Sequence, residues 1–124
     1  MGADRLFLLL GSLSGFAGVA LGAFAAHGLR SRLSVEMFDI FEVGVRYQMY
    51  HALGLVAVAL AFGRWPRPEF LVAGWSFVVG TVVFSGSLYV LSLSGIRWLG
   101  AITPIGGLAF LVGWLSLAWG AWKG

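Results

Sequence analysis

The chain has 124 residues, of which 60% are hydrophobic and only 10% are charged. A water-soluble domain of this size needs more polar surface, and eight scattered Lys and Arg do not make a nucleic-acid surface, although the net charge is +3. The absence of cysteine excludes disulfides, thiolate chemistry and cysteine-ligated metals. The composition predicts a small polytopic membrane protein that forms a single domain over residues 1–124.

Four apolar stretches are each long enough to cross a bilayer, whose hydrocarbon core of roughly 30 Å needs about 20 helical residues. They predict membrane spans over Leu6–Ala26, Val43–Phe62, Phe70–Ser94 and Pro104–Trp122. Between the first two spans, charged residues recur every three or four positions, which predicts an amphipathic helix over residues 34–46 that lies in the membrane interface. We therefore expect an all-α membrane protein with four transmembrane helices plus one interfacial amphipathic helix.

Local signals place the ends of these helices. Ser34 is a residue type that caps helix N-termini, and Gly28 and Gly95 are suited to end the first and third spans. Thr103 followed by Pro104 predicts the start of the fourth span, because proline is tolerated in the first helical turn.

The first span carries four glycines on one helical face. They are Gly11, Gly15, Gly18 and Gly22, and two of their intervals are GxxxG pairs, which let another helix approach closely. This face predicts tight helix packing. The sequence favours packing within the chain and leaves a homo-oligomer open.

The uncommon polar residues of the spans converge on one side of the membrane, because the end of each odd-numbered span and the start of each even-numbered span lie together. We call this group, together with two glycines of the fourth span, the polar half: His27, Arg46, Tyr47, Gln48, Tyr50, His51, Ser85, Ser87, Tyr89, Thr103, Gly106 and Gly107. Polar groups are costly in lipid, so we expect them to face the bundle interior. We expect His51 to lie near Ser85–Tyr89, with Thr103–Gly107 close by.

Two interpretations of the polar half stay open. It is either a hydrogen-bond network that sets the register of the helices, or a half-membrane cavity for a lipid-like or quinone-like head group or for protons. His27 and His51 lie at different depths, which argues against a bis-histidine haem. Every Asp and Glu lies outside the spans, which argues against a metal site, a Ser–His–Asp arrangement and an ion-coupled pump. We expect neither a metal nor a cofactor.

Four stretches carry a resemblance to a known family. They are Gly22–Leu29, Arg46–Leu53, Phe84–Tyr89 and Thr103–Leu108, with the sequences GAFAAHGL, RYQMYHAL, FSGSLY and TPIGGL. In this order they resemble the YgdD-like small membrane proteins of domain-of-unknown-function family 423, of the UPF0382 type. The resemblance implies a four-helix integral membrane protein of the bacterial inner membrane, with relatives in eukaryotes, and it implies no activity.

The leading interpretation of function is a non-enzymatic membrane protein that binds a lipid-like ligand or partner helices through the polar half. A small oligomeric transporter or channel is the alternative, and an intramembrane enzyme is the third. No catalytic residue is assigned.

The orientation in the membrane follows from few charges. An even number of spans puts both termini on one side, and we expect this side to be cytoplasmic. The positive-inside count is a tie between Arg5, Arg64, Arg67 and Lys123 on the terminal side and Arg30, Arg32, Arg46 and Arg97 on the other. The three acids that follow Arg32, and the expectation that Arg46 is drawn into the bundle, favour the terminal side.

Overall fold

A computed structural model describes residues 1–123, and every regular element in this part of the chain is helical. The elements are α1 (Ala3–Phe24), the π-helical turn η1 (Ala25–Leu29), α2 (Val35–Arg64), α3 (Pro68–Gly80), the π-helical turn η2 (Thr81–Ser85), α4 (Gly86–Ser94), the 3₁₀ turn η3 (Arg97–Ala101) and α5 (Thr103–Lys123). They join into four helical stretches that are long and apolar enough to cross a membrane: Ala3–Leu29, Val35–Arg64, Pro68–Ser94 and Arg97–Lys123. The prediction of an all-α, four-span membrane protein is confirmed.

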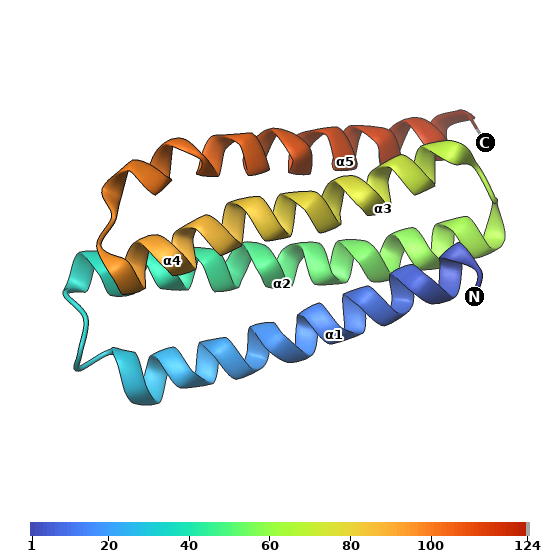
Figure 1. Ribbon diagram of the computed structural model, residues 1–124. Coiled ribbons are helices and arrows are strands. Elements are labelled where there is room, and N and C mark those ends of the chain that lie inside the picture. The colour runs from blue at the N-terminus through green and yellow to red at the C-terminus, as the bar shows by residue number, and fades with distance from the viewer. Residues whose placement is uncertain (124) are drawn as a thin grey trace.

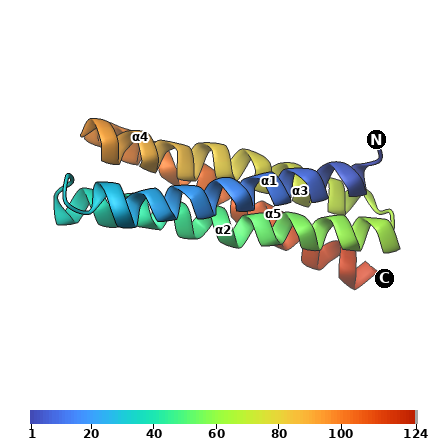
Figure 2. The ribbon, with the colours of Figure 1, turned by 90° about the horizontal axis from the view of Figure 1, so that it is seen from below.

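The four stretches lie antiparallel and side by side, and both ends of the chain are at the same end of the molecule (Figure 1). α1 packs mainly against α2, and α5 mainly against α3 and η2, whereas α2 also contacts α3, η2 and α4. The chain therefore forms two helical hairpins, α1–α2 and α3–α5, which meet along α2 and α3–α4. A view turned by 90° shows α4 and α2 on opposite sides of α1, with α3 passing behind α1 (Figure 2). α1 and α5 are the outer helices.

The amphipathic segment of residues 34–46 is not a separate helix. It forms the first turns of α2, which runs without a break from Val35 to Arg64. The side chain of Ser34 caps this helix, as predicted, by accepting a hydrogen bond from the Met37 amide over 3.2 Å. No proline interrupts residues 34–64, so the apolar span simply continues the amphipathic turns.

Two glycines predicted as helix ends differ in outcome. Gly95 ends α4 with a left-handed backbone, φ 75°, as expected for a helix C-terminus. Gly28 does not end a helix in this way, because it lies inside η1, and Gly95 alone has a positive φ among the described residues. The first span continues through the π-helical turn to Leu29.

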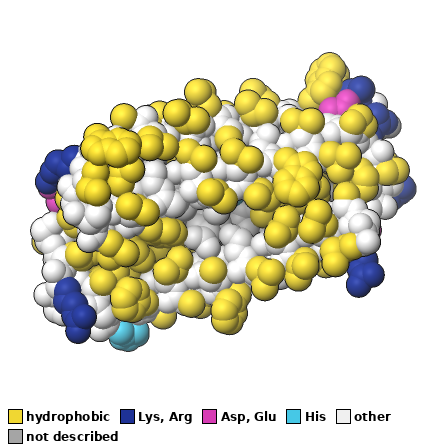
Figure 3. Space-filling view, in the orientation of Figure 1, with side chains coloured by type: hydrophobic (Ala, Val, Ile, Leu, Met, Phe, Trp, Pro, Cys, Tyr) yellow, Lys and Arg dark blue, Asp and Glu magenta, His cyan; other side chains and the backbone are white. Residues whose placement is uncertain are grey.

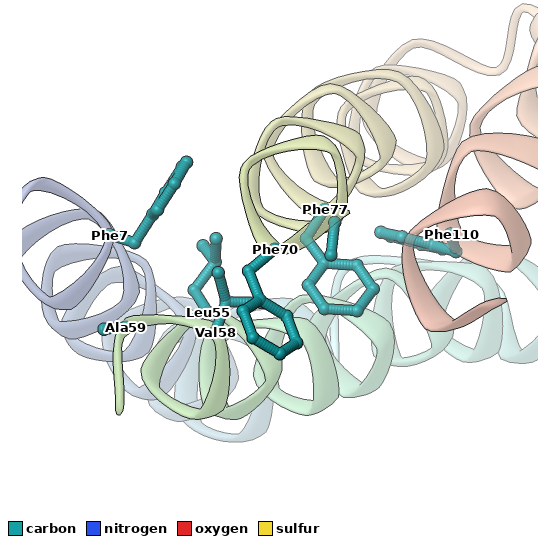
Figure 4. Packing of buried hydrophobic residues seen from close by; sticks show 8 residues of the cluster. Phe7, Leu55, Val58, Ala59, Phe70, Phe77 and Phe110 are labelled. Atoms are coloured by element: carbon teal, nitrogen blue, oxygen red, sulfur yellow. The ribbon is translucent and has the colours of Figure 1, made fainter. Parts of the chain in front are cut away.

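Phenylalanines of three spans and aliphatic side chains of α2 form the core. Figure 4 shows its cluster, made of Phe7 from α1, Leu55, Val58 and Ala59 from α2, Phe70, Ala73 and Phe77 from α3, and Phe110 from α5. Glycines make room for these rings: a Cβ at Gly113 would stand 2.5 Å from the Phe77 ring. In lipid, close packing of this kind replaces hydrophobic burial as the force that joins helices.

The glycine face of α1 lies against α2 within the same chain. A Cβ at Gly11 would stand 2.9 Å from the Ala52 backbone oxygen, and a Cβ at Gly18 would stand 2.5 Å from Met49 Sδ. The other two glycines of this face, Gly15 and Gly22, have Ala52 and Val45 as their nearest neighbours. These glycines therefore pack the first hairpin within the chain, and a homo-oligomer stays a prediction.

Candidate functional site

Gln48 on α2 joins three helices. Its Nε2 donates to the backbone oxygen of Ser14 on α1 over 2.9 Å, and its Oε1 accepts from the Tyr89 hydroxyl on α4 over 2.6 Å. The Gln48 side chain is buried. Because both ends of the amide are used, this residue sets the position of α1 and α4 relative to α2.

Gly44, one turn before Gln48, lets α4 and η2 approach α2 closely. A Cβ at this position would stand 2.8 Å from Cε1 of Tyr89. The approach places Ser85, which is 1% exposed, within reach of the α2 backbone, and its Oγ donates to the Gly44 oxygen over 2.7 Å. Interhelical hydrogen bonds of this kind contribute about 0.6 kcal/mol on average in a membrane.

A third contact joins α4 to the start of α5. Ser87 Oγ donates to the Phe84 carbonyl over 2.9 Å and lies 2.6 Å from Oγ1 of Thr103. Either hydroxyl can donate in the second bond, because Thr103 Oγ1 also lies 3.5 Å from the Leu99 carbonyl oxygen. One turn further along α5, Gly106 packs on the Phe84 backbone, where a Cβ would stand 2.7 Å from Cβ of Phe84.

His51 lies near the middle of α2 and is almost fully buried, at 4% exposure. Its Nδ1 is 2.6 Å from the Tyr47 carbonyl, and its Nε2 is 3.0 Å from Nε1 of Trp114 on α5. An indole N–H can only donate, so Nε2 must be the acceptor and Nδ1 must carry the proton. The ring stacks on Phe110, with centroids 3.5 Å apart and an interplanar angle of 8°. This geometry assigns a neutral imidazole.

A groove opens beside His51 between α2 and α5. It has a volume of about 380 Å³. We call it the aromatic groove, and it is lined by Tyr47, Tyr50, His51, Phe84, Gly107, Phe110, Leu111 and Trp114. Tyr47 and Tyr50 are 38% and 54% exposed, and the hydrogen bonds of the described chain use neither of their hydroxyls. The groove is thus walled by aromatic rings, and two of its lining residues carry hydroxyls that no hydrogen bond of the described chain uses.

The polar half divides into residues that come together and residues that do not. Gln48, Ser85, Ser87, Tyr89 and Thr103 hydrogen-bond between or within the helices, as described above. His51 and Gly107 lie at the aromatic groove with Tyr47 and Tyr50. His27 and Arg46 are exposed on the surface of the bundle. Among residues 1–123, no three His, Cys, Asp or Glu side chains are grouped so that they could hold a metal ion.

The partners of His51 were missed by the sequence interpretation, which placed serines of the third span opposite the ring. The structure places Trp114 and Phe110 of α5 there instead. A signal for Trp114 was present: a tryptophan in the middle of a span carries an N–H that needs an acceptor. The uniformly apolar pattern of α5 gave no indication of which face points inward.

Comparisons with known proteins agree with the fold. The model of the family described as "Protein of unknown function (DUF423)" matches residues 21–107. The UPF0382 membrane protein SSP2132 of Staphylococcus saprophyticus is 47% identical over 96% of this chain and 98% of its own length. The UPF0382 membrane protein YwdK of Bacillus subtilis is 42% identical over 96% and 98%, and the UPF0382 inner membrane protein YgdD of Escherichia coli K12 is 39% identical over 95% and 90%.

No solved structure matches the chain. The resemblance seen in the four sequence stretches is confirmed by relatives that span nearly the whole chain. The chain belongs to the DUF423 family of membrane proteins, whose relatives carry the name UPF0382.

Proposed function

We propose that this membrane protein binds a lipid-like molecule with a planar or small polar head group in the aromatic groove. The observation that carries the proposal is the groove itself, whose aromatic lining includes Tyr47 and Tyr50, two residues with unused hydroxyls. Ligand sites are typically concave, mostly apolar and equipped with a few polar groups that orient the ligand.

The buried hydrogen bonds separate the residues that hold the helices together from the residues that shape the aromatic groove. Gln48, Ser85 and Thr103 bond to partners inside the chain, so their part is to hold the helices together. His51 is positioned differently, because its bond to Trp114 and its stack on Phe110 hold two walls of the groove in place. His51 is a positioning residue in this proposal.

The same geometry favours binding over catalysis. A general acid or base needs a nitrogen or oxygen that can reach the substrate. Both ring nitrogens of His51 are engaged by Tyr47 and Trp114, and no Asp or Glu lines the groove. The groove therefore offers no free histidine and no carboxylate as a general base, and only the hydroxyls of Tyr47 and Tyr50 remain.

The test fills the groove without disturbing the core. Leu111 lines the groove and is 60% exposed, so Leu111→Trp occupies space in the groove. Leu115→Trp is the matched control, since Leu115 lies one turn further along α5, is 72% exposed and does not line the groove. Each protein is extracted with its native lipid in polymer discs, and the retained lipid-soluble compounds are quantified by mass spectrometry.

We expect the wild type and Leu115→Trp to retain a compound with a planar or small polar head group that Leu111→Trp loses. Equal retention by all three proteins, or no retained compound beyond bulk phospholipid, would contradict the proposal. A solute flux through liposomes that Leu111→Trp leaves intact would instead support the transporter alternative.

We further propose that both termini face the cytoplasm. The ion pairs do not separate the two sides, because Arg97–Glu36 lies opposite the termini and Lys123–Glu69 lies beside them. Support comes from the three acids that follow Arg32, which offset the arginines on the side opposite the termini. A reporter fused to the C-terminus should be active only in the cytoplasm. Activity only outside the cytoplasm would reverse the orientation.

A further inference from the structure

A second groove lies at the end of the bundle that holds both termini, far along the long axis from the loop between α1 and α2 (Figure 1). It runs between the start of α1 and the end of α2 and has a volume of about 400 Å³. We call it the arginine groove, and its lining residues are Asp4, Arg5, Leu8, Ala59, Leu60, Gly63 and Arg64. We propose that the arginine groove binds the phosphate head group of an anionic phospholipid.

The groove lies at the depth where head groups are found. The Arg64 guanidinium stands over the Trp65 ring, 5.1 Å from its centroid, and Trp65 is 49% exposed. Indole rings at helix ends sit at the level of the lipid head groups, so this contact holds the guanidinium at that level. On the face drawn in Figure 3, Lys and Arg side chains lie at the two ends of the molecule, and no charged side chain is seen between them.

The apolar part of the groove continues below the arginines. Leu8 of α1 and Leu60 of α2 are 45% and 69% exposed and line the side of the groove that leads toward the middle of the helices. A groove with arginines at the membrane surface and leucines toward the membrane interior matches a phospholipid, whose phosphate would lie at the arginines and whose acyl chain would lie along the leucines. A soluble anion would use only the arginines.

The charges of the groove favour an anion. Two ion pairs form in residues 1–123, Arg97–Glu36 and Lys123–Glu69, and neither involves Arg5 or Arg64. Guanidinium groups match the geometry of phosphate oxygens. Asp4 also lines the groove and opposes an anion, but its Oδ1 accepts a hydrogen bond from the Arg5 backbone amide over 2.9 Å. With two arginines and one carboxylate, the groove keeps a net positive charge.

The experiment titrates the full chain, purified in detergent, with phosphatidylglycerol and with phosphatidylcholine of the same acyl chains. Bound lipid is counted by native mass spectrometry. The variant is Arg5→Gln with Arg64→Gln, and the control is Arg30→Gln with Arg32→Gln, which removes the same charge at the opposite end. An arginine near an anionic lipid contributes roughly a fivefold gain in affinity, so the first variant should bind phosphatidylglycerol about 25-fold more weakly.

Asp4→Asn gives a second test, in which the proposal predicts stronger and not weaker lipid binding. The amide oxygen of Asn still accepts the hydrogen bond from the Arg5 amide, while the opposing charge is gone, so binding of phosphatidylglycerol should strengthen severalfold. Phosphatidylcholine binding should change in none of these variants.

Three outcomes would overturn the proposal. One is an equal loss in the two arginine variants, and another is no preference of the wild type for phosphatidylglycerol over phosphatidylcholine. The third is full competition by millimolar inorganic phosphate, which would assign a soluble-anion site. The proposal is independent of the aromatic groove, because Leu111→Trp should bind phosphatidylglycerol like the wild type.

Discussion

Trp114 and His51 connect the two helical hairpins through one hydrogen bond, which the indole Nε1 donates to the imidazole Nε2 over 3.0 Å. The bond fixes the tautomer of His51, because the remaining ring nitrogen must then donate to the Tyr47 carbonyl. Since Trp114 also forms a wall of the aromatic groove, the same bond ties the packing of the bundle to the shape of the candidate site.

Replacing His51 should lower the stability of the bundle, and by more when the new side chain cannot accept the hydrogen bond from the Trp114 indole. His51→Leu leaves the indole N–H unpaired in a dry environment, and we expect a loss of about 0.6–1.7 kcal/mol in the free energy of unfolding. His51→Gln offers an amide oxygen as acceptor and should lose less. Reversible unfolding in mixed micelles with SDS measures both.

A double-mutant cycle isolates the bond. Trp114→Phe removes the donor, so adding His51→Leu to it should cost less than His51→Leu costs alone. Trp119→Phe is the control, since Trp119 is 56% exposed on the outer helix, and it should change little. Additive losses for His51→Leu and Trp114→Phe would show that the bond does not stabilise the protein.

The glycines of α1 should tolerate alanine in an order that their neighbours decide. Gly11→Ala places a methyl group 2.9 Å from the Ala52 backbone oxygen, which cannot move easily, so this variant should be the least stable. Gly18→Ala meets the flexible end of Met49 and should be milder. At Gly15 the nearest atom to an added Cβ is 3.9 Å away, and alanine there should be neutral or stabilising by up to about 1 kcal/mol through its higher helix propensity.

Thermal unfolding in detergent ranks the three variants. Equal midpoints for Gly11→Ala and Gly15→Ala would mean that α1 does not approach α2 as closely at Gly11 as the structure shows.

The parts of the fold that follow from local chemistry were predictable. The four spans rest on length and hydropathy, and the Ser34 cap and the Gly95 helix end rest on backbone rules that act within one turn. The join between the amphipathic turns and α2 was not predictable in this way, because no proline or turn residue marks either a break or its absence. Whether such a segment lies in the interface or continues the span depends on tertiary packing such as that of Phe41 against Tyr89, whose ring centroids are 4.9 Å apart.

The candidate site depends on how helices are rotated against each other, which apolar spans do not reveal. Gln48 and Tyr89 were singled out because polar residues in lipid seek partners, and the structure pairs them. Trp114 and Phe110 were not singled out. Each lies among apolar neighbours on α5, where the residues that face inward are as hydrophobic as those that face outward. The prediction for Arg46 was wrong: its charge suggested that it is drawn into the bundle, but it lies exposed on the surface.

The bond between Gln48 and Tyr89 should show coupling when its ends are removed together. Gln48→Leu strands the Tyr89 hydroxyl, and Tyr89→Phe strands one lone pair of the amide, so each should lower the free energy of unfolding by about 0.6–1.7 kcal/mol. The double variant leaves no stranded group in this pair and should lose less than the sum. Tyr50→Phe is a control, since the Tyr50 hydroxyl takes no part in the hydrogen bonds of the described chain. A double variant that loses the full sum would contradict a direct bond.

Ser14 and Thr81 carry buried hydroxyls with no hydrogen-bond partner among the described residues. Both line a crevice of about 280 Å³ between α1, α2 and α3–η2, and the face drawn in Figure 3 is hollowed near its middle, over the space between α1 and α3. An unpaired buried hydroxyl is unfavourable, so Ser14→Ala and Thr81→Val should leave the stability unchanged or raise it.

Ser85→Ala is the matched control for these two variants, because Ser85 is equally a hydroxyl inside the bundle but donates to the Gly44 oxygen over 2.7 Å. The free energy of unfolding of Ser85→Ala should fall by about 0.6 kcal/mol or more, since the substitution removes an interhelical hydrogen bond. The comparison is made by thermal unfolding in detergent and again in native-lipid discs. If Ser14→Ala and Thr81→Val lose as much as Ser85→Ala in discs but not in detergent, a molecule from the membrane must satisfy these hydroxyls in the crevice.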